Sequence, residues 1–502
     1  MKLAYYAKKN PSKAAIIEES GNSLSHLELE MKSAQLANLL AEKGLKRGDN
    51  IAILLKNSID YFIVAWAAQR SGLYFTPVNW HLAVEEIVYI VTDCAAKALF
   101  ADASLGETAQ KIKDRPSHLT HFYSCNGQLQ DFSELHSAIK EMPTIPEGIE
   151  PAGNMMLYSS GTTGVPKGIK RPLPDSDYSA VLGLEPLMSE LWNFDENSVY
   201  LSPAPLYHAA PLGWCMSTQK LGGTTVIMES FDSEAFLSLI DKYTISHTQC
   251  VPTMFSRLLN LPEQVRRQYK CSSLEFVVHA AAPCPIEIKE EMLAWWGPII
   301  HEFYSGSEGF GLCAIDAATW LEHKGSVGKP LLGKLHIVDE DNEELPATKI
   351  GTIYFENPEM NFHYHNDPEK TLGCLLNNNW ATFGDMGYLD EEGYLYLVDR
   401  RTDLILSGGV NIYPSEVECA LRPHPAVFDV AVIGRPDADL GQRVVAIIEL
   451  AKNHSDTKQL SIELIELCQQ RIAKFKCPRT IEYRVLPRTP TGKLLRRKLK
   501  EN

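Results

Sequence analysis

Short apolar strands alternate with helix-length segments through the first hundred residues of this 502-residue chain. The pattern predicts strands at residues 51–55, 73–78 and 98–101, with helices over 59–72 and near 84–92 between them. A strand–helix–strand order implies parallel strands whose faces are covered by helices. Ligands bind beyond the carboxyl ends of the strands in such sheets. The sequence therefore predicts an α/β fold whose site lies among the loops that follow the strands.

A helix is also predicted before the first of these strands, over residues 25–44. Ser25 and Glu28 form a capping-box pattern, and Gly44 supplies a stop signal. The spacing of the apolar residues between these signals predicts a buried stripe made of Leu27, Met31, Ala34 and Leu39.

A glycine-rich stretch from Tyr158 to Gly168 follows a predicted buried strand at residues 154–158. Its glycines allow the backbone to approach a ligand closely, its hydroxyl groups are neutral donors, and Lys167 adds a positive charge. Pro166 stands before the lysine, so the stretch is not a Walker A motif. A flexible surface hairpin is the alternative to a phosphate-binding loop. The candidate phosphate contacts are Ser159, Ser160, Gly161, Thr162, Thr163, Gly164 and Lys167.

The strand pattern continues through the middle of the chain and then changes. Strands are predicted at 198–202, 222–228, 275–279 and 299–304. Residues 247–255 are predicted to begin a helix, and residues 175–194 to be irregular. From residue 334 onward, short alternating strands with turn signals predict a small antiparallel unit, with strands at 334–339, 351–356 and 393–398.

The last hundred residues have enough elements of their own for an independent core. The pattern predicts a helix over 414–421, strands at 427–433 and 443–450, and an amphipathic helix over 461–474. The polar stretch Arg400–Asp403 precedes them. We therefore predict an N-terminal domain over residues 1–399, a hinge at 400–403 and a mobile C-terminal domain over 404–502.

Residue types that can bind ligands or take part in a reaction occur in several of the predicted strand-end loops. Tyr304 offers an aromatic face for stacking, and Glu308 is a hard oxygen ligand suited to Mg²⁺ bound to phosphate. Asp385 lies in a tight turn, where a carboxylate can accept two ribose hydroxyls, and the small residues Ala280–Pro283 can lie beside a flat ring. Lys493 follows a glycine in a loop near the end of the chain. Each also fits an ordinary role as a core aromatic, a turn cap or a solvated charge.

Composition excludes some classes of function. The formal net charge of −15 argues against sequence-independent binding of nucleic acid. The eleven cysteines form no C-x-x-C pair, which favours reduced thiols in a cytoplasm over a disulfide framework or a zinc site. The first residues lack the apolar core of a signal peptide, and no apolar run is long enough for a membrane span. We expect a cytoplasmic protein without a transmembrane segment.

Taken in order, these stretches resemble the motifs of the adenylate-forming superfamily of acyl-CoA synthetases, luciferases and non-ribosomal adenylation domains. The resemblance covers nearly the whole chain. Residues 251–255, Ser407–Pro414 and Glu416 are most similar to fatty-acyl-CoA ligases. The matching motifs are the phosphate loop at 158–168, the aromatic-histidine motif at 204–208, the adenine and Mg²⁺ motif at 304–309, the ribose motif at 383–385, the hinge at 400–403 and the catalytic lysine motif at 490–493.

The resemblance implies an acyl-CoA synthetase with ATP, Mg²⁺ and CoA as cofactors. Lys493, Glu308 and His208 would be catalytic, and Glu308 and Thr163 would hold Mg²⁺. Besides the phosphate contacts, the implied nucleotide and CoA contacts are Ala281, Ala282, Pro283, Tyr304, Ser307, Asp385, Arg400, Ser407, Gly408 and Gly409. The implied acid site comprises Tyr207, Trp214, Val251, Thr253, Met254, His279 and Ser305.

The implied acid site is mainly apolar, which favours a medium- to long-chain fatty acid. Another apolar acid with an aryl, cyclic or steroid side chain stays open, as does a carrier-protein phosphopantetheine in place of CoA. A luciferase-like oxygenase and a non-catalytic nucleotide sensor are further alternatives, and a homodimer stays open. Tyr207 and His208 would also fit a packed aromatic and a core histidine.

The chain departs from the family pattern at four positions. Ser305 replaces a usual glycine and Ser307 a usual threonine, although the hydroxyl at 307 is kept. Asp399 replaces a common glycine, and Thr402 stands at the hinge where aspartate or lysine is more frequent. The last two substitutions affect the expected details of domain rotation rather than the expected chemistry.

Overall fold

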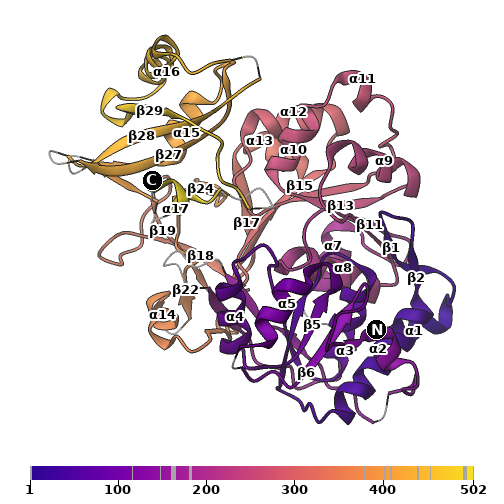
Figure 1. Ribbon diagram of the computed structural model, residues 1–502. Helices are drawn as coiled ribbons and strands as arrows, with labels where there is room; N and C mark the ends of the chain where they lie inside the picture. The colour runs from indigo at the N-terminus through magenta and orange to yellow at the C-terminus, as the bar shows by residue number, and fades with distance from the viewer. Residues whose placement is uncertain are drawn as a thin grey trace.

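The molecule consists of a large N-terminal part and a smaller C-terminal unit that projects from it (Figure 1). The computed structural model describes residues 3–115, 117–146, 148–159, 166–179, 184–377, 379–400, 403–407, 410–437, 440–452, 454–489 and 494–500. The mixed α/β class predicted from the sequence is confirmed by this architecture.

The first sheet has six strands in the order β7-β6-β5-β3-β4-β8, and all neighbouring strands are parallel. Its strands are β3 (Asn50–Leu54), β4 (Tyr74–Pro77), β5 (Ala96–Asp102), β6 (His121–Cys125), β7 (Ser133–Glu134) and β8 (Asn154–Met155). Its helices are α2 (His26–Glu42), α3 (Ile59–Arg70), α4 (Val84–Asp93), α5 (Gly106–Lys113) and α6 (Leu135–Ile139). The alternation of elements along the chain thus produced the expected parallel sheet.

The second sheet has 15 strands, and it changes from parallel to antiparallel pairing partway across. Strands β1, β12, β11, β13, β14 and β15 run parallel side by side, so their carboxyl ends lie at one edge. Their bounds are Ala14–Glu18, Thr224–Ile227, Val199–Ser202, His247–Cys250, Phe276–His279 and Ile300–Ser305; β2 (Ser23–Ser25) flanks β1. The helices of this region are α1 (Leu3–Lys9), α7 (Leu184–Trp192), α8 (Ala209–Lys220), α9 (Ser233–Tyr243), α10 (Pro252–Leu259), α11 (Glu263–Arg266) and α12 (Ile286–Trp296).

The remainder of the second sheet is antiparallel, as the turn-rich pattern after residue 334 predicted. It comprises β16 (Leu312–Ile315), β17 (Ser326–Leu332), β18 (Lys334–Val338), β19 (Gly351–Glu356), β21 (Leu375–Asn377), β22 (Trp380–Ala381), β23 (Asp385–Leu389) and β24 (Leu395–Arg400), with helices α13 (Ala317–Glu322) and α14 (Pro368–Gly373). A separate antiparallel sheet joins β9 (Leu157–Ser159), β10 (Lys167–Lys170) and β20 (His363–Tyr364).

The C-terminal unit is built on its own sheet, in which β25, β26, β27 and β28 are antiparallel and β29 runs parallel to β28. These strands span Ile405–Ser407, Val410–Ile412, Val427–Asp437, Gly441–Leu450 and Thr480–Tyr483, and the helices are α15 (Pro414–Leu421), α16 (Lys458–Arg471) and α17 (Arg496–Lys500). Buried residues between 405 and 477 form a separate cluster. A separate core supports the boundary at 400–403, which stays a prediction.

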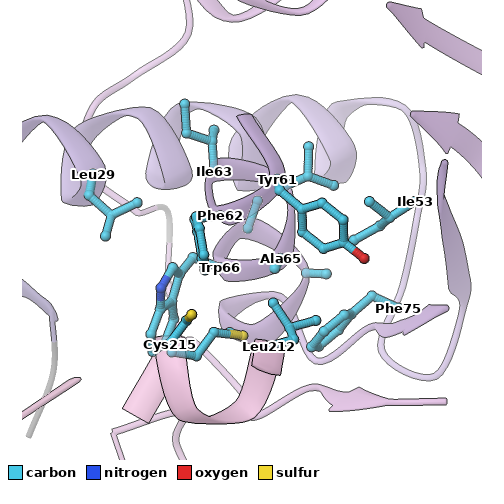
Figure 2. Packing of buried hydrophobic residues seen from close by; sticks show 14 of the residues in the cluster. Leu29, Ile53, Tyr61, Phe62, Ile63, Ala65, Trp66, Phe75, Leu212 and Cys215 are labelled. Carbon is cyan, nitrogen blue, oxygen red and sulfur yellow. The ribbon is translucent and has the colours of Figure 1, made fainter. Parts of the chain in front are cut away.

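Helix α3 is buried on every side, whereas the sequence predicted only one apolar face. All residues from Asp60 to Arg70 are buried, because side chains from α2, α8, β3 and β4 surround the helix (Figure 2). The guanidinium of Arg70 is matched by two carboxylates, Glu30 at 2.6 Å and Glu150 at 2.5 Å. A buried cation of this kind is tolerated because it is paired.

Helix α2 has the predicted capping box, but only two of the four predicted stripe residues, Ala34 and Leu39, are buried. Leu27 and Met31 are 40% and 36% exposed, whereas Leu29, Leu36 and Leu40 are buried. The packing partners α1 and α3 decide which face turns inward.

In three segments the local structure differs from the one predicted from the sequence. Residues 184–192 form helix α7 rather than an irregular stretch, since Met188 and Trp192 pack against the core. Residues 247–250 form the buried strand β13, and helix α10 begins only at Pro252, whose fixed backbone suits a first turn. Residues 154–159 are divided between two sheets as β8 and β9.

Helix α16 starts and ends three residues earlier than predicted, because the Thr457 side chain caps the amide of Leu460 at 3.0 Å. Among the described residues, no helix is both long and apolar enough to cross a lipid bilayer, as expected from the sequence.

Candidate active site

The carboxyl ends of the parallel strands in the second sheet gather the predicted site residues. Val251 follows β13, Ala281 follows β14, and Ser305 ends β15. Because these strands are neighbours and parallel, the three segments lie at one edge of the sheet. The site is therefore built from segments that are far apart in the sequence.

The glycine-rich loop connects two antiparallel strands. Ser159 at the end of β9 is paired with Lys167 at the start of β10. The loop residues Ser160, Gly161, Thr162, Thr163 and Gly164 and the side chain of Ser159 lie outside the described residues.

Lys167 is held by an ion pair that the sequence did not suggest. Its Nζ lies 2.6 Å from Oδ2 of Asp367, and this hydrogen bond raises the pKa of the lysine. Asp367 also caps helix α14 by accepting a hydrogen bond from the amide of Lys370. The sequence Asp367-Pro368 is a recognisable cap signal, but the pairing with Lys167 depends on the fold. A bound phosphate chain would compete with Asp367 for the lysine.

Tyr304 and Asp385, predicted as separate contacts of a nucleotide, lie side by side. The Tyr304 hydroxyl donates a hydrogen bond of 2.7 Å to Oδ2 of Asp385, across a sequence separation of 81 residues. Arg400 is the backbone partner of Asp385 in the β23–β24 ladder, although its side chain is not described. Gly306 lies against Phe383, where a Cβ atom would collide with the ring. An aromatic face, a carboxylate and a cationic position thus converge.

Glu308 and the preceding Ser307 are each hydrogen-bonded by a residue that the sequence did not suggest. The Tyr364 hydroxyl donates to Oε1 of Glu308 at 2.6 Å, and the half-buried Arg171 donates from Nη2 to the carbonyl oxygen of Ser307 at 2.6 Å. Burial lowers the pKa of Arg171, while the negative charge of Glu308 opposes that shift. Gly309 has φ +70°, and a Cβ atom there would overlap the guanidinium. No local sequence pattern predicts either contact, because both contacts join segments that are far apart in the sequence.

The loop after β14 carries the predicted adenine contacts Ala281, Ala282 and Pro283. Ala281 has φ +73°, an unfavourable conformation for a residue with a side chain. The strand before the loop is fixed by charge: His279 is fully buried with Nε2 3.3 Å from Oε2 of Glu302. Lys289 Nζ lies 2.6 Å from the same oxygen. The predicted acid contact His279 thus belongs to a buried ion network.

The other predicted acid-site residues surround the start of α8 and α10. His208 is the N-cap residue of α8, and its ring lies 4.6 Å from that of Tyr207. Trp214 is 2% exposed and stacks on Phe303 at 6.1 Å. Ser305 donates a hydrogen bond to the Gly311 carbonyl at 2.7 Å. Val251 caps α10, and its first turn contains Thr253 and the buried Met254.

The structure describes only some of the site residues predicted in the C-terminal unit. Lys493, Gly408 and Gly409 lie outside the described residues, as does Thr402. Ser407 ends β25, where it pairs with Gly441. The unit is attached to the N-terminal part by Ser415, whose Oγ donates to the Val398 carbonyl at 2.6 Å.

The arrangement fits a nucleotide bound with Mg²⁺. Glu308 keeps one carboxylate oxygen, Oε2, without a hydrogen-bond donor among the described residues, so it can bind a hard cation. Within the described part of the chain, no group of three or more His, Cys, Asp or Glu side chains forms a complete metal site. A Mg²⁺ ion would therefore be bound together with phosphate oxygens, which is its usual mode with nucleotides.

Comparison with known proteins supports the same conclusion. The family model of the AMP-binding enzymes matches residues 3–365, and that of the AMP-binding enzyme C-terminal domain matches residues 416–493. The chain is 30% identical to a feruloyl-CoA synthase of Amycolatopsis over 96% of its own length and 94% of the relative. It is 29% identical to the fatty acid–[acyl-carrier-protein] ligase ScoC of Streptomyces coeruleorubidus, over 99% and 95% of the two chains.

Among solved structures, the chain resembles o-succinylbenzoate-CoA synthetase of Bacillus subtilis in complex with an acyl-adenylate. The TM-score is 0.82 at 28% identity, and the match covers 100% of this chain and 98% of the other. The resemblance to adenylate-forming enzymes inferred from the motifs is thereby confirmed. The chain belongs to the family of AMP-binding enzymes.

Proposed function

We propose that this enzyme is an AMP-forming acid–thiol ligase that activates an apolar carboxylic acid and transfers it to CoA. The observation that carries the proposal is the hydrogen bond between Tyr304 and Asp385, placed beside Arg400 at the edge where the strands end. This hydrogen bond brings together an aromatic face that can stack on a base and a carboxylate that can accept hydrogen bonds from the ribose hydroxyls. The family match and the acid–thiol ligases among the relatives support it.

In the first half-reaction, a carboxylate oxygen of the acid attacks the α-phosphorus of ATP and pyrophosphate leaves. The protein's task is to position the reactants and neutralise charge. Lys167 and the hydroxyls of the glycine-rich loop, Thr162 and Thr163 among them, would bind the leaving phosphates. Glu308, with Thr163, would hold Mg²⁺, which neutralises phosphate charge when bound. Lys493 would bridge the carboxylate and phosphate oxygens.

In the second half-reaction, the CoA thiol loses its proton, its sulfur attacks the acyl-adenylate carbonyl, and AMP leaves. The C-terminal domain would turn about residues 400–403, which removes Lys493 from the site. The segment Ser407–Gly409 would then line the path of the pantetheine, where glycines leave room for a narrow channel. His208 would lie beside the carboxyl group of the bound acid.

The acid itself is proposed to be apolar. Trp214, Val251 and Met254 are apolar, and burial lowers the pKa of His279, which favours its neutral form. A medium- to long-chain fatty acid or an aryl, cyclic or steroid-type acid fits this composition. The relatives include ligases named for a fatty acid, for ferulate and for 2-succinylbenzoate.

The function is tested by pyrophosphate release over a panel of carboxylic acids, with ATP and Mg²⁺, in the presence and absence of CoA. Turnover that requires CoA and reaches an optimum within one class of acids is the expected result. Release that ignores CoA, with acyl transfer to a carrier protein instead, would identify the acceptor as phosphopantetheine on a protein. No release with any acid would contradict the proposal.

Replacement of Asp385 by alanine tests the nucleotide site. We expect the KM for ATP to rise about tenfold or more, since hydrogen bonds to a charged acceptor contribute roughly 1.5–3 kcal/mol each. Tyr304→Phe should have a smaller effect, because it removes one hydroxyl and keeps the ring. The exposed neighbour Glu391→Ala is the control. A loss of thermal stability without any change in the KM for ATP would mean that Asp385 only caps a turn.

A further inference from the structure

A cavity of about 430 Å³ lies at the amino ends of β3, β5 and β6, in the first sheet. The candidate active site uses the carboxyl ends of the second sheet, so this cavity is a separate feature. Its volume lies within the range of about 300–1,000 Å³ that is usual for small-molecule sites. The lining residues that carry charge or can carry it are Lys43, Lys97, Lys170, His118, His121, His365 and Asp49.

The cavity is cationic on a protein whose net charge is −15. Asp49 is the one carboxylate among the described residues that line it, and its Oδ2 is already paired with Lys97 at 2.8 Å. Lys43 pairs with Oε1 of the neighbouring Glu42 at 3.3 Å. Lys170 is therefore the lining lysine that has no carboxylate partner among the described residues. A surplus of cations at one place attracts multivalent anions.

Lys170 shows most clearly that a counterion is missing. Its Nζ lies 4.6 Å from the centre of the Tyr74 ring, and no described carboxylate lies within 4.0 Å of it. Burial lowers its pKa. The pKa of the neighbouring His363 is lowered by burial and by the charges of Lys170 and His365. The positive charge of Lys170 thus disfavours a charge on the histidine beside it, and an anion nearby would offset this effect.

We propose that this cavity binds a small phosphate-class anion, in the size range from inorganic pyrophosphate to a mononucleotide. Lysine ammonium groups bind phosphate oxygens as point charges, and charge-assisted hydrogen bonds of this kind are the strong ones. The imidazoles of His118 and His121 add further donors at the rim. A single cavity of this size suits a small anion rather than a nucleic acid, which needs an extended basic surface.

The test is calorimetric titration of the full chain with pyrophosphate, phosphate and AMP. All proteins carry Lys167→Gln, which weakens binding of the same anions at the glycine-rich loop. The cavity variant adds Lys97→Gln and Lys170→Gln. The matched control adds Lys9→Gln and Lys324→Gln, two exposed lysines that each form an ion pair elsewhere. No acid or CoA is present, so failure of the proposed ligase reaction would leave this result unaffected.

We expect the cavity variant to bind pyrophosphate about tenfold more weakly or worse, and the control to bind as the parent does. Equal affinities in both variants would overturn the proposal. Binding to phosphatidylglycerol vesicles without binding to any soluble anion would also overturn it, because the ligand would then be a lipid surface. If the cavity variant fails to fold, Lys43→Gln with His118→Gln replaces it, since both side chains are exposed.

Discussion

Replacing Lys493 by alanine is expected to slow adenylation by roughly 10²–10³, the scale of losing one preorganised electrostatic contact in a transition state. The same variant should form the thioester from supplied acyl-adenylate at a rate close to that of the parent. The reason is that Lys493 is proposed to act only while the C-terminal domain is in its first orientation. ATP–pyrophosphate exchange measures the first half-reaction, and thioester formation measures the second.

Lys498→Ala is the matched control for this experiment, because Lys498 is exposed and lies in the neighbouring helix α17. It should leave both half-reactions unchanged. Equal loss of both half-reactions in the Lys493 variant would contradict the assignment of separate domain orientations. An unchanged exchange rate would remove Lys493 from the mechanism.

Replacing Lys289 by alanine is expected to destabilise the N-terminal part by roughly 3–5 kcal/mol. The Lys289 side chain is 0% and the Glu302 side chain 7% exposed, and Lys289 also lies over the Trp320 ring at 4.5 Å. Burial would raise the pKa of Glu302, but the charges of His279 and Lys289 outweigh this effect and lower it. Without the lysine, Glu302 loses its closest counterion while it stays buried. The expected loss of stability is that of a buried carboxylate left without its main counterion.

Thermal unfolding measures this effect as a drop of roughly 4–6 °C in the midpoint. Lys324→Ala is the control, because its pair with Glu290 is exposed and such pairs contribute about 0–1 kcal/mol. A double variant with Lys289→Met and Glu302→Leu should recover much of the loss, since apolar replacement of a buried pair is often neutral. A midpoint for Lys289→Ala equal to that of the control would show that the pair contributes nothing.

The two experiments address different parts of the same site. The ion network fixes the strand end from which the Ala280–Pro283 loop departs, whereas Lys493 is proposed to arrive from the mobile domain. Stability therefore depends on groups that are buried and already paired. Catalysis is proposed to depend on groups that meet only when substrates and both domains are in place.

Local signals in the sequence determined many elements. The capping box of Ser25 and Glu28 begins α2, and Pro414 begins α15, because these signals act within a few residues. The alternation of strands and helices predicted a parallel sheet, and turn-rich spacing after residue 334 predicted an antiparallel one. The motif order was enough to indicate the family and to select Tyr304 and Asp385.

Other features depended on contacts between remote segments, which the sequence alone does not reveal. Which face of α2 is buried, and the burial of α3 on all sides, are decided by the neighbouring elements. Tyr364 reaches Glu308, and Asp367 reaches Lys167, only because separate strands meet. Arg171 bonds the Ser307 carbonyl for the same reason. Local order follows from interactions a few residues apart, so it can be read along the chain. The partners of a buried charge come from anywhere in the chain, and only the tertiary structure decides them.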